Sequence, residues 1–117
     1  MCTRFVYRGS DMITGFNFDI DLSVWTHKVK KEKERFYIGI LRPDGAYHSY
    51  HGVNQNGNAG TLLYVHGNSA GLYQSGGNCM TIADLTEQFI KSQISFDEVL
   101  QIIKSKKIVY ASDATMQ

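Results

Sequence analysis

The residue with the most distinctive chemical setting in this sequence is Cys2, which directly follows Met1. A cysteine thiol becomes a useful nucleophile only when a base or a positive charge favours its thiolate. The α-amine of a chain that starts at Cys2 would titrate near pH ~7.7–8.0, so it could accept the thiol proton at neutral pH. Removal of Met1 would therefore place a nucleophile and a base on one residue. Free cysteines are also often small buried hydrophobic residues, and the position alone leaves both interpretations open.

Cys2 begins the first of two segments that predict a β-hairpin. Residues 2–8 alternate apolar and polar side chains and are rich in β-forming residues, and residues 12–20 form a second such segment. The Arg-Gly-Ser-Asp stretch between them is typical of a turn. In such a hairpin, residues of the two strands face each other across a short gap.

The rest of the chain predicts four more strands and two helices. The strands are expected at residues 35–42, 46–51, 58–66 and 106–112. Thr81 with Asp84, and Ser95 with Glu98, have the spacing of helix capping boxes, and apolar residues follow each pair at helical spacing. This order predicts an α+β fold in which the helices pack on one face of a mostly antiparallel sheet.

Charge and composition exclude several classes of protein. The chain has 117 residues and a net charge of +1, which fits one domain without a strong preference for a charged partner. The charge run at residues 28–35 is expected to be a solvated loop or edge, with an anion-binding patch as the weaker alternative. Its mixed signs argue against nucleic acid. No run is long enough to cross a membrane, and the first segment lacks a secretory apolar core, so a cytoplasmic location is expected.

A metal site is not expected from the histidines. His48 and His51 are three residues apart in a predicted strand, where they would point to opposite faces of the sheet. Cys2 and Cys79 lack the spacing of metal ligands, and cytosolic thiols are normally reduced. Cys79 just before a helix is expected to be a small core residue, although a helix N-terminus can also activate a thiol.

Three blocks of the chain, taken in their order and spacing, resemble the choloylglycine hydrolase and penicillin V acylase family. The first is Met-Cys-Thr followed by Asn17-Phe18-Asp19, the second runs from Gly52 to Tyr64, and the third is Asn-Cys-Met-Thr-Ile-Ala-Asp-Leu from residue 78. Members of this family are N-terminal-nucleophile hydrolases that cleave linear amide C–N bonds. The resemblance covers the whole chain, but only about the N-terminal half of a typical member.

The resemblance implies a four-layer αββα sandwich, of which this chain would supply about one sheet and two covering helices. It implies that residues 1–117 form one such domain, incomplete at its C-terminus. Such a half-domain would expose apolar sheet surface, so it is expected to self-associate or to bind a missing C-terminal half. The resemblance also implies a small-molecule acyl amide as substrate and no cofactor.

Three catalytic roles are implied by matching the chain to the family residue by residue. Cys2 matches the nucleophile, and Asp19 matches the aspartate that orients the cysteine amine. Tyr64 matches a position that contributes to the oxyanion hole, through its backbone N–H. From the residues alone, Asp19 could equally satisfy a turn amide at a strand end, and Tyr64 could be an ordinary strand aromatic.

The substrate site is expected to include Phe16, Asn17 and His66. Phe16 stands where the family often has an arginine, so the positive charge of that arginine is missing here. His66 follows the strand of Tyr64 and could line the substrate mouth, or it could be a surface loop residue. The asparagine and arginine that complete the family's catalytic cluster have no counterpart in this sequence.

Two other interpretations remain open at this point. The chain could be a catalytically inactive fragment or subunit of such an enzyme, because its Cys2 nitrogen is an amide while Met1 is attached. It could instead be a thiol redox or binding protein that uses Cys2 and Cys79.

Overall fold

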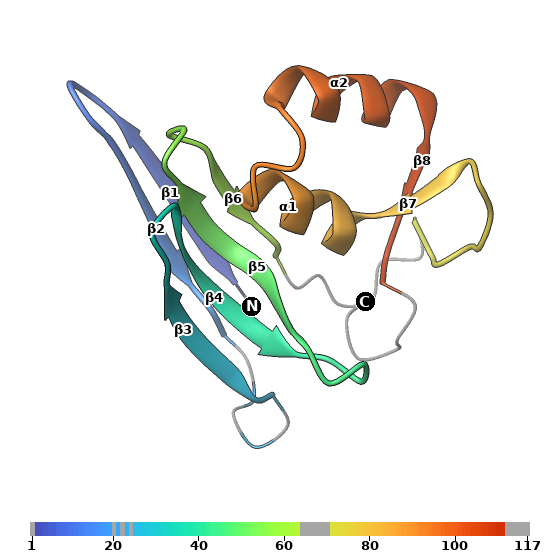
Figure 1. Ribbon diagram of the computed structural model, residues 1–117, viewed down its shortest axis with the longest axis horizontal. Coiled ribbons are helices and arrows are strands. Elements are labelled where there is room, and N and C mark those ends of the chain that lie inside the picture. The colour runs from blue at the N-terminus through green and yellow to red at the C-terminus, as the bar shows by residue number, and fades with distance from the viewer. Residues whose placement is uncertain (1, 20, 22, 24, 64–70, 112–117) are drawn as a thin grey trace.

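The computed structural model describes residues 2–19, 21, 23, 25–63 and 71–111, and shows an α+β fold with mostly antiparallel sheets (Figure 1). Its elements in chain order are β1 (Thr3–Arg8), β2 (Met12–Asn17), β3 (His27–Lys31), β4 (Arg35–Leu41), β5 (Tyr47–Asn54), β6 (Ala59–Thr61), β7 (Cys79–Thr81), α1 (Ile82–Ile90), α2 (Phe96–Ser105) and β8 (Lys107–Val109). The general class predicted from the sequence is therefore confirmed.

Strands β1 and β2 form the predicted hairpin, with Thr3 opposite Asn17 and Arg8 opposite Met12. Gly15 lies opposite Phe5, and the Phe5 ring lies across it. A Cβ at Gly15 would come within 2.0 Å of the Phe5 ring, so a larger residue there would require this exposed ring to move. Strand β2 ends at Asn17, so Asp19 follows the strand instead of lying within it.

The central sheet has the order β3-β4-β5-β6, with every pair antiparallel. The first half of the charge run, residues 28–31, lies in edge strand β3, which agrees with the prediction of a solvated loop or edge. Charged lysines on an edge strand discourage pairing with other chains. Gly45, with φ +80°, closes the β4–β5 turn, and Gly57, with φ +76°, closes the β5–β6 turn, as the turn sequences predict.

Both predicted helices form, and their caps follow from the sequence. The Thr81 hydroxyl accepts a hydrogen bond from the Asp84 N–H at 3.0 Å, and Ser95 with Glu98 forms a complete capping box. Helix α1 packs on β5 and β6, where the Asn54 amide donates to the Ile90 carbonyl at 3.2 Å. No helix in the described part of the chain is long and apolar enough to cross a membrane.

A short parallel pair, β7 with β8, was not predicted. Residues 79–81 were expected to lie between a loop and a helix, but Met80 pairs with Ile108 of the last strand. The sequence does not predict this pair, because three residues are too few to show strand alternation. Val109 of β8 is 1% exposed, so burial of its side chain stabilises the position of this strand.

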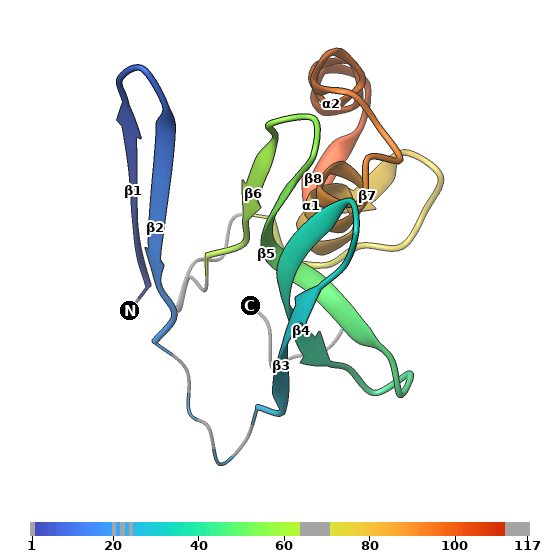
Figure 2. The ribbon, with the colours of Figure 1, turned by 60° about the vertical axis from the view of Figure 1, so that its left-hand side comes forward.

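The elements form three layers (Figure 2). The β1–β2 hairpin forms one layer, the four-stranded sheet the next, and the helices cover the opposite face of that sheet. Gly60 of β6 allows the sheet and α1 to approach closely, since a Cβ there would lie 2.8 Å from the Ile90 side chain. The lack of a side chain at Gly60 therefore makes room for the Ile90 side chain of the helix.

We expect Ile90→Ala to lower the free energy of unfolding by about 2–5 kcal/mol, because it leaves a cavity between α1 and the sheet. Ile90 is 0% exposed, whereas Ile103 in α2 is 48% exposed and provides a matched control. Urea denaturation should show a change within about 0.5 kcal/mol for Ile103→Ala. Equal effects of the two substitutions would contradict this view of the core.

Candidate active site

The hairpin register places Cys2 and Asp19 at the same end of the hairpin. Thr3 pairs with Asn17, so Cys2 lies one residue before the first pair and Asp19 two residues beyond it. Cys2 is half-buried and Asp19 is exposed. The nucleophile and carboxylate implied by the family resemblance thus come from adjacent chain segments at the open end of the hairpin, away from its turn.

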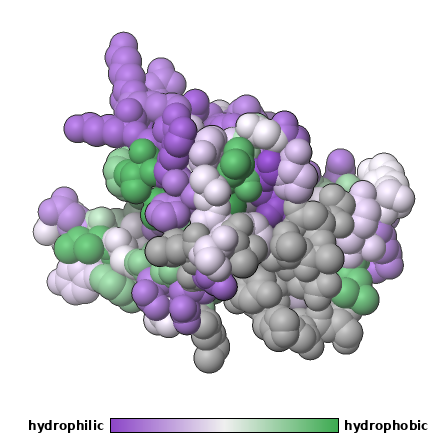
Figure 3. Space-filling view, turned by 90° about the horizontal axis from the view of Figure 1, so that it is seen from below, coloured by the Kyte–Doolittle hydropathy of each residue, from purple (hydrophilic) through white to green (hydrophobic). Residues whose placement is uncertain are grey.

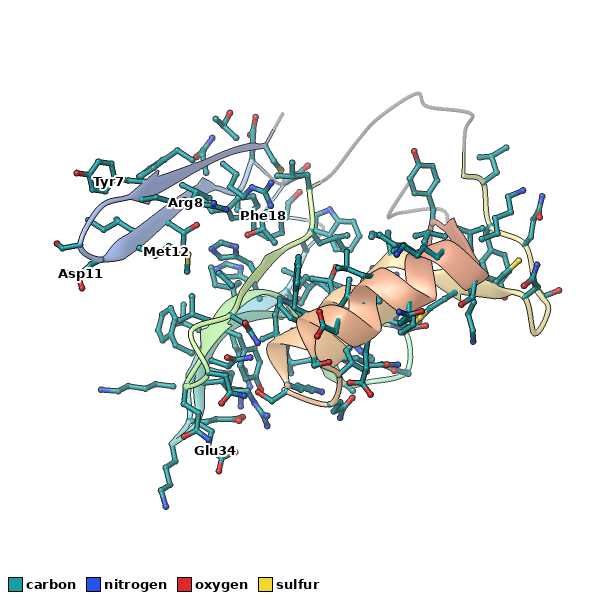
Figure 4. The ribbon with its side chains drawn as sticks, turned by 90° about the horizontal axis from the view of Figure 1, so that it is seen from above. Tyr7, Arg8, Asp11, Met12, Phe18 and Glu34 are labelled. Carbon is teal, nitrogen blue, oxygen red and sulfur yellow. The ribbon has the colours of Figure 1, made fainter. Side chains whose placement is uncertain are left out.

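Aromatic contacts anchor this end of the hairpin to the rest of the molecule. The Phe16 ring stacks on His51 of β5, with 4.2 Å between ring centroids, and lies 5.4 Å from the Phe18 ring. Phe18 packs against the buried core cluster that contains Ile40 and Tyr50. In Figure 4, Phe18 lies near the sheet, whereas Tyr7 and the turn extend away from it. The Cys2 end is therefore the fixed end of the hairpin.

The two faces of the hairpin carry different side chains, and strand alternation assigns Cys2 to one of these faces. Arg4 lies directly opposite Phe16, so both point to the face that Phe16 turns toward the sheet. Continuing the strand alternation by one residue places Cys2 on this face too. Asn17 pairs with Thr3 on the other face and is exposed. Phe16 and Asn17, both expected in the substrate site, therefore point to opposite sides of β2.

His51 is the residue of this region that the sequence reasoning missed. Burial lowers the pKa of His51, because it disfavours the charged form of the ring. Its Nδ1 lies 2.9 Å from the Thr61 hydroxyl, and its face is covered by Phe16. Strand alternation assigns the face of His51, but the contact with a hairpin 35 positions earlier in the chain depends on tertiary packing that the sequence alone does not reveal.

The side chains of the two histidines of β5 lie on opposite faces of the sheet, as predicted. His51 contacts the hairpin, whereas His48 contacts Glu87 of helix α1, with 3.0 Å between His48 Nδ1 and Glu87 Oε1. Within the described residues, no group of His, Cys, Asp or Glu side chains could hold a metal ion. Cys2 and Cys79 are both free thiols, on β1's N-terminal flank and on β7 respectively.

Two of the expected site residues, Tyr64 and His66, lie in segment 64–70, outside the described residues. Leu63, the last described residue before that segment, follows Leu62, which packs against the core cluster. The oxyanion-hole and substrate-mouth roles expected for Tyr64 and His66 stay predictions.

Comparison of the chain with protein-family models, curated proteins and solved structures found no match. The described site contains a half-buried thiol, Cys2, and a carboxylate, Asp19, at the same end of the hairpin. The same end of the hairpin carries the rings of Phe16 and Phe18, and Phe16 stacks on His51.

Proposed function

We propose that this chain belongs to an amide hydrolase of the N-terminal-nucleophile class, with Cys2 as nucleophile once Met1 is removed. The observation that carries the proposal is the hairpin register, which puts Cys2 and Asp19 at the same anchored end of one hairpin. In addition, the resemblance to the choloylglycine hydrolase and penicillin V acylase family assigns the catalytic roles to these two residues. The layering of hairpin, sheet and helices is compatible with part of an αββα sandwich.

The proposed reaction uses the free amine of Cys2 as its base. The amine takes the thiol proton while the sulfur attacks the carbonyl carbon of a linear acyl amide. The tetrahedral intermediate collapses when the amine returns the proton to the leaving nitrogen, which leaves a thioester on Cys2. Water, deprotonated by the same amine, then releases the acid and regenerates the thiol. In this scheme Asp19 orients the amine, and the backbone N–H of Tyr64 stabilises the oxyanion.

The substrate in this proposal is a small acyl amide, and the reaction uses no cofactor. Phe16, Phe18 and His51 form an aromatic wall on the face to which the strand alternation assigns Cys2. Such a wall favours an apolar acyl group, because burial of apolar surface drives binding. A reducing cytoplasm suits this site, since it keeps a catalytic thiol free.

The proposal extends to a partner for the hairpin. Phe5, Tyr7 and Ile13 share the face that points away from the sheet, and they are 59%, 59% and 55% exposed. Figure 3 shows hydrophobic residues at the surface on the left of the view, the side on which Figure 1 places the hairpin. A two-stranded hairpin is only marginally stable alone, so we propose that a second copy or a complementary C-terminal half covers this face.

The experiment that tests the proposed function measures amine release from a panel of acyl amides. Phenoxymethylpenicillin, taurocholate, an N-acyl homoserine lactone and a simple N-acyl amide would be incubated with protein whose chain starts at Cys2, without added metal or cofactor. We expect hydrolysis of at least one panel member. Absence of hydrolysis across the panel would contradict activity of this chain and favour the alternative of an inactive subunit.

A further inference from the structure

His48 lies at the start of β5, with its ring between two carboxylates that come from different elements. Its Nε2 lies 2.6 Å from Asp44 Oδ2 in the β4–β5 turn, and its Nδ1 lies 3.0 Å from Glu87 Oε1 in helix α1. An ionised carboxylate only accepts hydrogen bonds, and a neutral imidazole has a single N–H. Both contacts are therefore hydrogen bonds at the same time only when the ring is an imidazolium.

The surroundings of the ring favour this charged form. Partial burial lowers the pKa of His48, but the hydrogen bonds and charges of Asp44 and Glu87 outweigh this, so the pKa is raised above its usual value. The N–H of Ala46, and then His48, lower the pKa of Asp44, so this carboxylate stays ionised while the ring titrates. The other charged and titratable groups around the ring are Arg42 and Tyr50 from the sheet and its turn, and Asp84 and Lys91 from the helix.

The two carboxylates differ in what the loss of a donor costs them. The Glu87 side chain is 14% exposed and also accepts a hydrogen bond from the Ser49 N–H, whereas the Asp44 side chain is 56% exposed. Water can replace the donor at the exposed carboxylate more easily than at the buried one. When the ring is neutral, its one N–H therefore remains on Glu87. The lone pair of Nε2 then faces Asp44, and that contact becomes repulsive.

Asp44 connects this contact to the backbone of the turn. While its Oδ2 contacts His48, its Oδ1 accepts a hydrogen bond from the Ala46 N–H at 2.9 Å. A carboxylate held at both oxygens has one orientation, and repulsion at one of them favours rotation of the side chain toward water. Loss of the His48 contact is therefore expected to weaken the hydrogen bond of Ala46 as well.

The β4–β5 turn and the start of α1 form two walls of a pocket of about 340 Å³. Pro43 and Asp44 line it from the turn, and Ala83 and Asp84 line it from the helix. We propose that His48 is a pH-sensitive clamp that holds the turn against α1 when protonated and releases the turn side of this pocket when neutral. This inference does not depend on the proposed hydrolysis.

NMR of the full chain between pH 5.5 and 9 tests the clamp. We expect the His48 ring to titrate above ~6.5, the ordinary histidine value. As the ring loses its proton, exchange of the Ala46 amide with water should rise about 2- to 12-fold beyond the intrinsic effect of pH, the range for one lost hydrogen bond. The Asn56 amide donates to Asn54 Oδ1 at 3.0 Å in the β5–β6 turn, so it is the matched control and should show no such rise.

Two substitutions separate the clamp from a general effect of pH on the turn. His48→Gln removes the titrating ring, so the additional exchange of the Ala46 amide should no longer depend on pH. Asp44→Asn keeps an oxygen for the Ala46 N–H but removes the charge, so it should lower the midpoint of the His48 ring. A ring that titrates at or below ~6.5 in the wild type, or an Ala46 amide that behaves like the Asn56 amide, would overturn the proposal.

Stability provides the second measurement for the clamp. Because the pKa of His48 is raised in the folded chain, its stabilising contribution is fully present below pH ~6.5 and is lost as pH rises through the higher folded value. The difference in urea midpoint between the wild type and His48→Gln should therefore shrink from pH 6 to pH 9. His27→Gln, at an exposed position of β3, should show no such trend. A constant difference for His48→Gln would contradict the clamp.

Discussion

Cys2→Ala is expected to abolish acyl-amide hydrolysis, with a loss in turnover of at least about 10³-fold. The substitution removes the only atom that the proposed mechanism uses as a nucleophile, and no other residue forms the thioester. The remaining groups could still bind substrate, so substrate affinity should change little. The measurement is amine release under single-turnover conditions, with wild-type and variant proteins that both start at residue 2.

Cys79→Ala is the matched control for this result. Cys79 is the second free thiol of the chain, half-buried on β7, outside the hairpin. It should retain hydrolysis within about twofold of the wild type if it serves only as a small packed side chain. Turnover that survives Cys2→Ala, or that disappears in Cys79→Ala, would contradict the role of Cys2 as nucleophile. Either result would favour a thiol redox function instead.

A second large loss of hydrolysis is expected when only the backbone nitrogen of Cys2 is changed, from an amine to an amide. In a protein with a retained N-terminal extension, this nitrogen is an amide without basicity, so it cannot take the thiol proton. General base catalysis contributes about 10²–10⁴-fold, and loss of the base should slow hydrolysis by a factor in this range. A fusion whose protease site ends directly before Cys2 allows one preparation to be assayed before and after cleavage.

Cleavage should restore activity, and the restored rate should rise with pH as the α-amine loses its proton near pH ~7.7–8.0. The same fusion carrying Cys2→Ala is the control. Cleavage should leave this variant inactive, which shows that the restored activity depends on Cys2 and not on a change in folding when the extension is removed. If the uncleaved fusion hydrolyses the substrate as fast as the cleaved protein, the amine is not the base, although Cys2 could remain the nucleophile.

The hairpin and the turns could be predicted from local chemistry alone. Residues 2–8 and 12–20 alternate, and a glycine stands wherever the β4–β5 and β5–β6 turns need a positive φ. The caps of both helices follow from Thr81 and Ser95. These features depend on residues close together in the chain, which is why the sequence is informative about them.

Features that depend on distant residues could not be predicted in this way. The stacking of Phe16 on His51, and the parallel pair of β7 with β8, bring together segments separated by 28 residues or more. The position of Arg4 relative to Phe16 also needed the exact register of the hairpin.

The role of Cys2 as nucleophile is tested most directly by the mass of the N-terminal peptide after a reaction with substrate is quenched in acid. If Cys2 is the nucleophile, the peptide begins at Cys2 and carries the acyl group on sulfur, with its α-amine unmodified. The adduct should be lost on standing at neutral pH as water hydrolyses the thioester. Amine release without any acylated Cys2, or an acyl group found on another residue, would contradict the role of Cys2 as nucleophile.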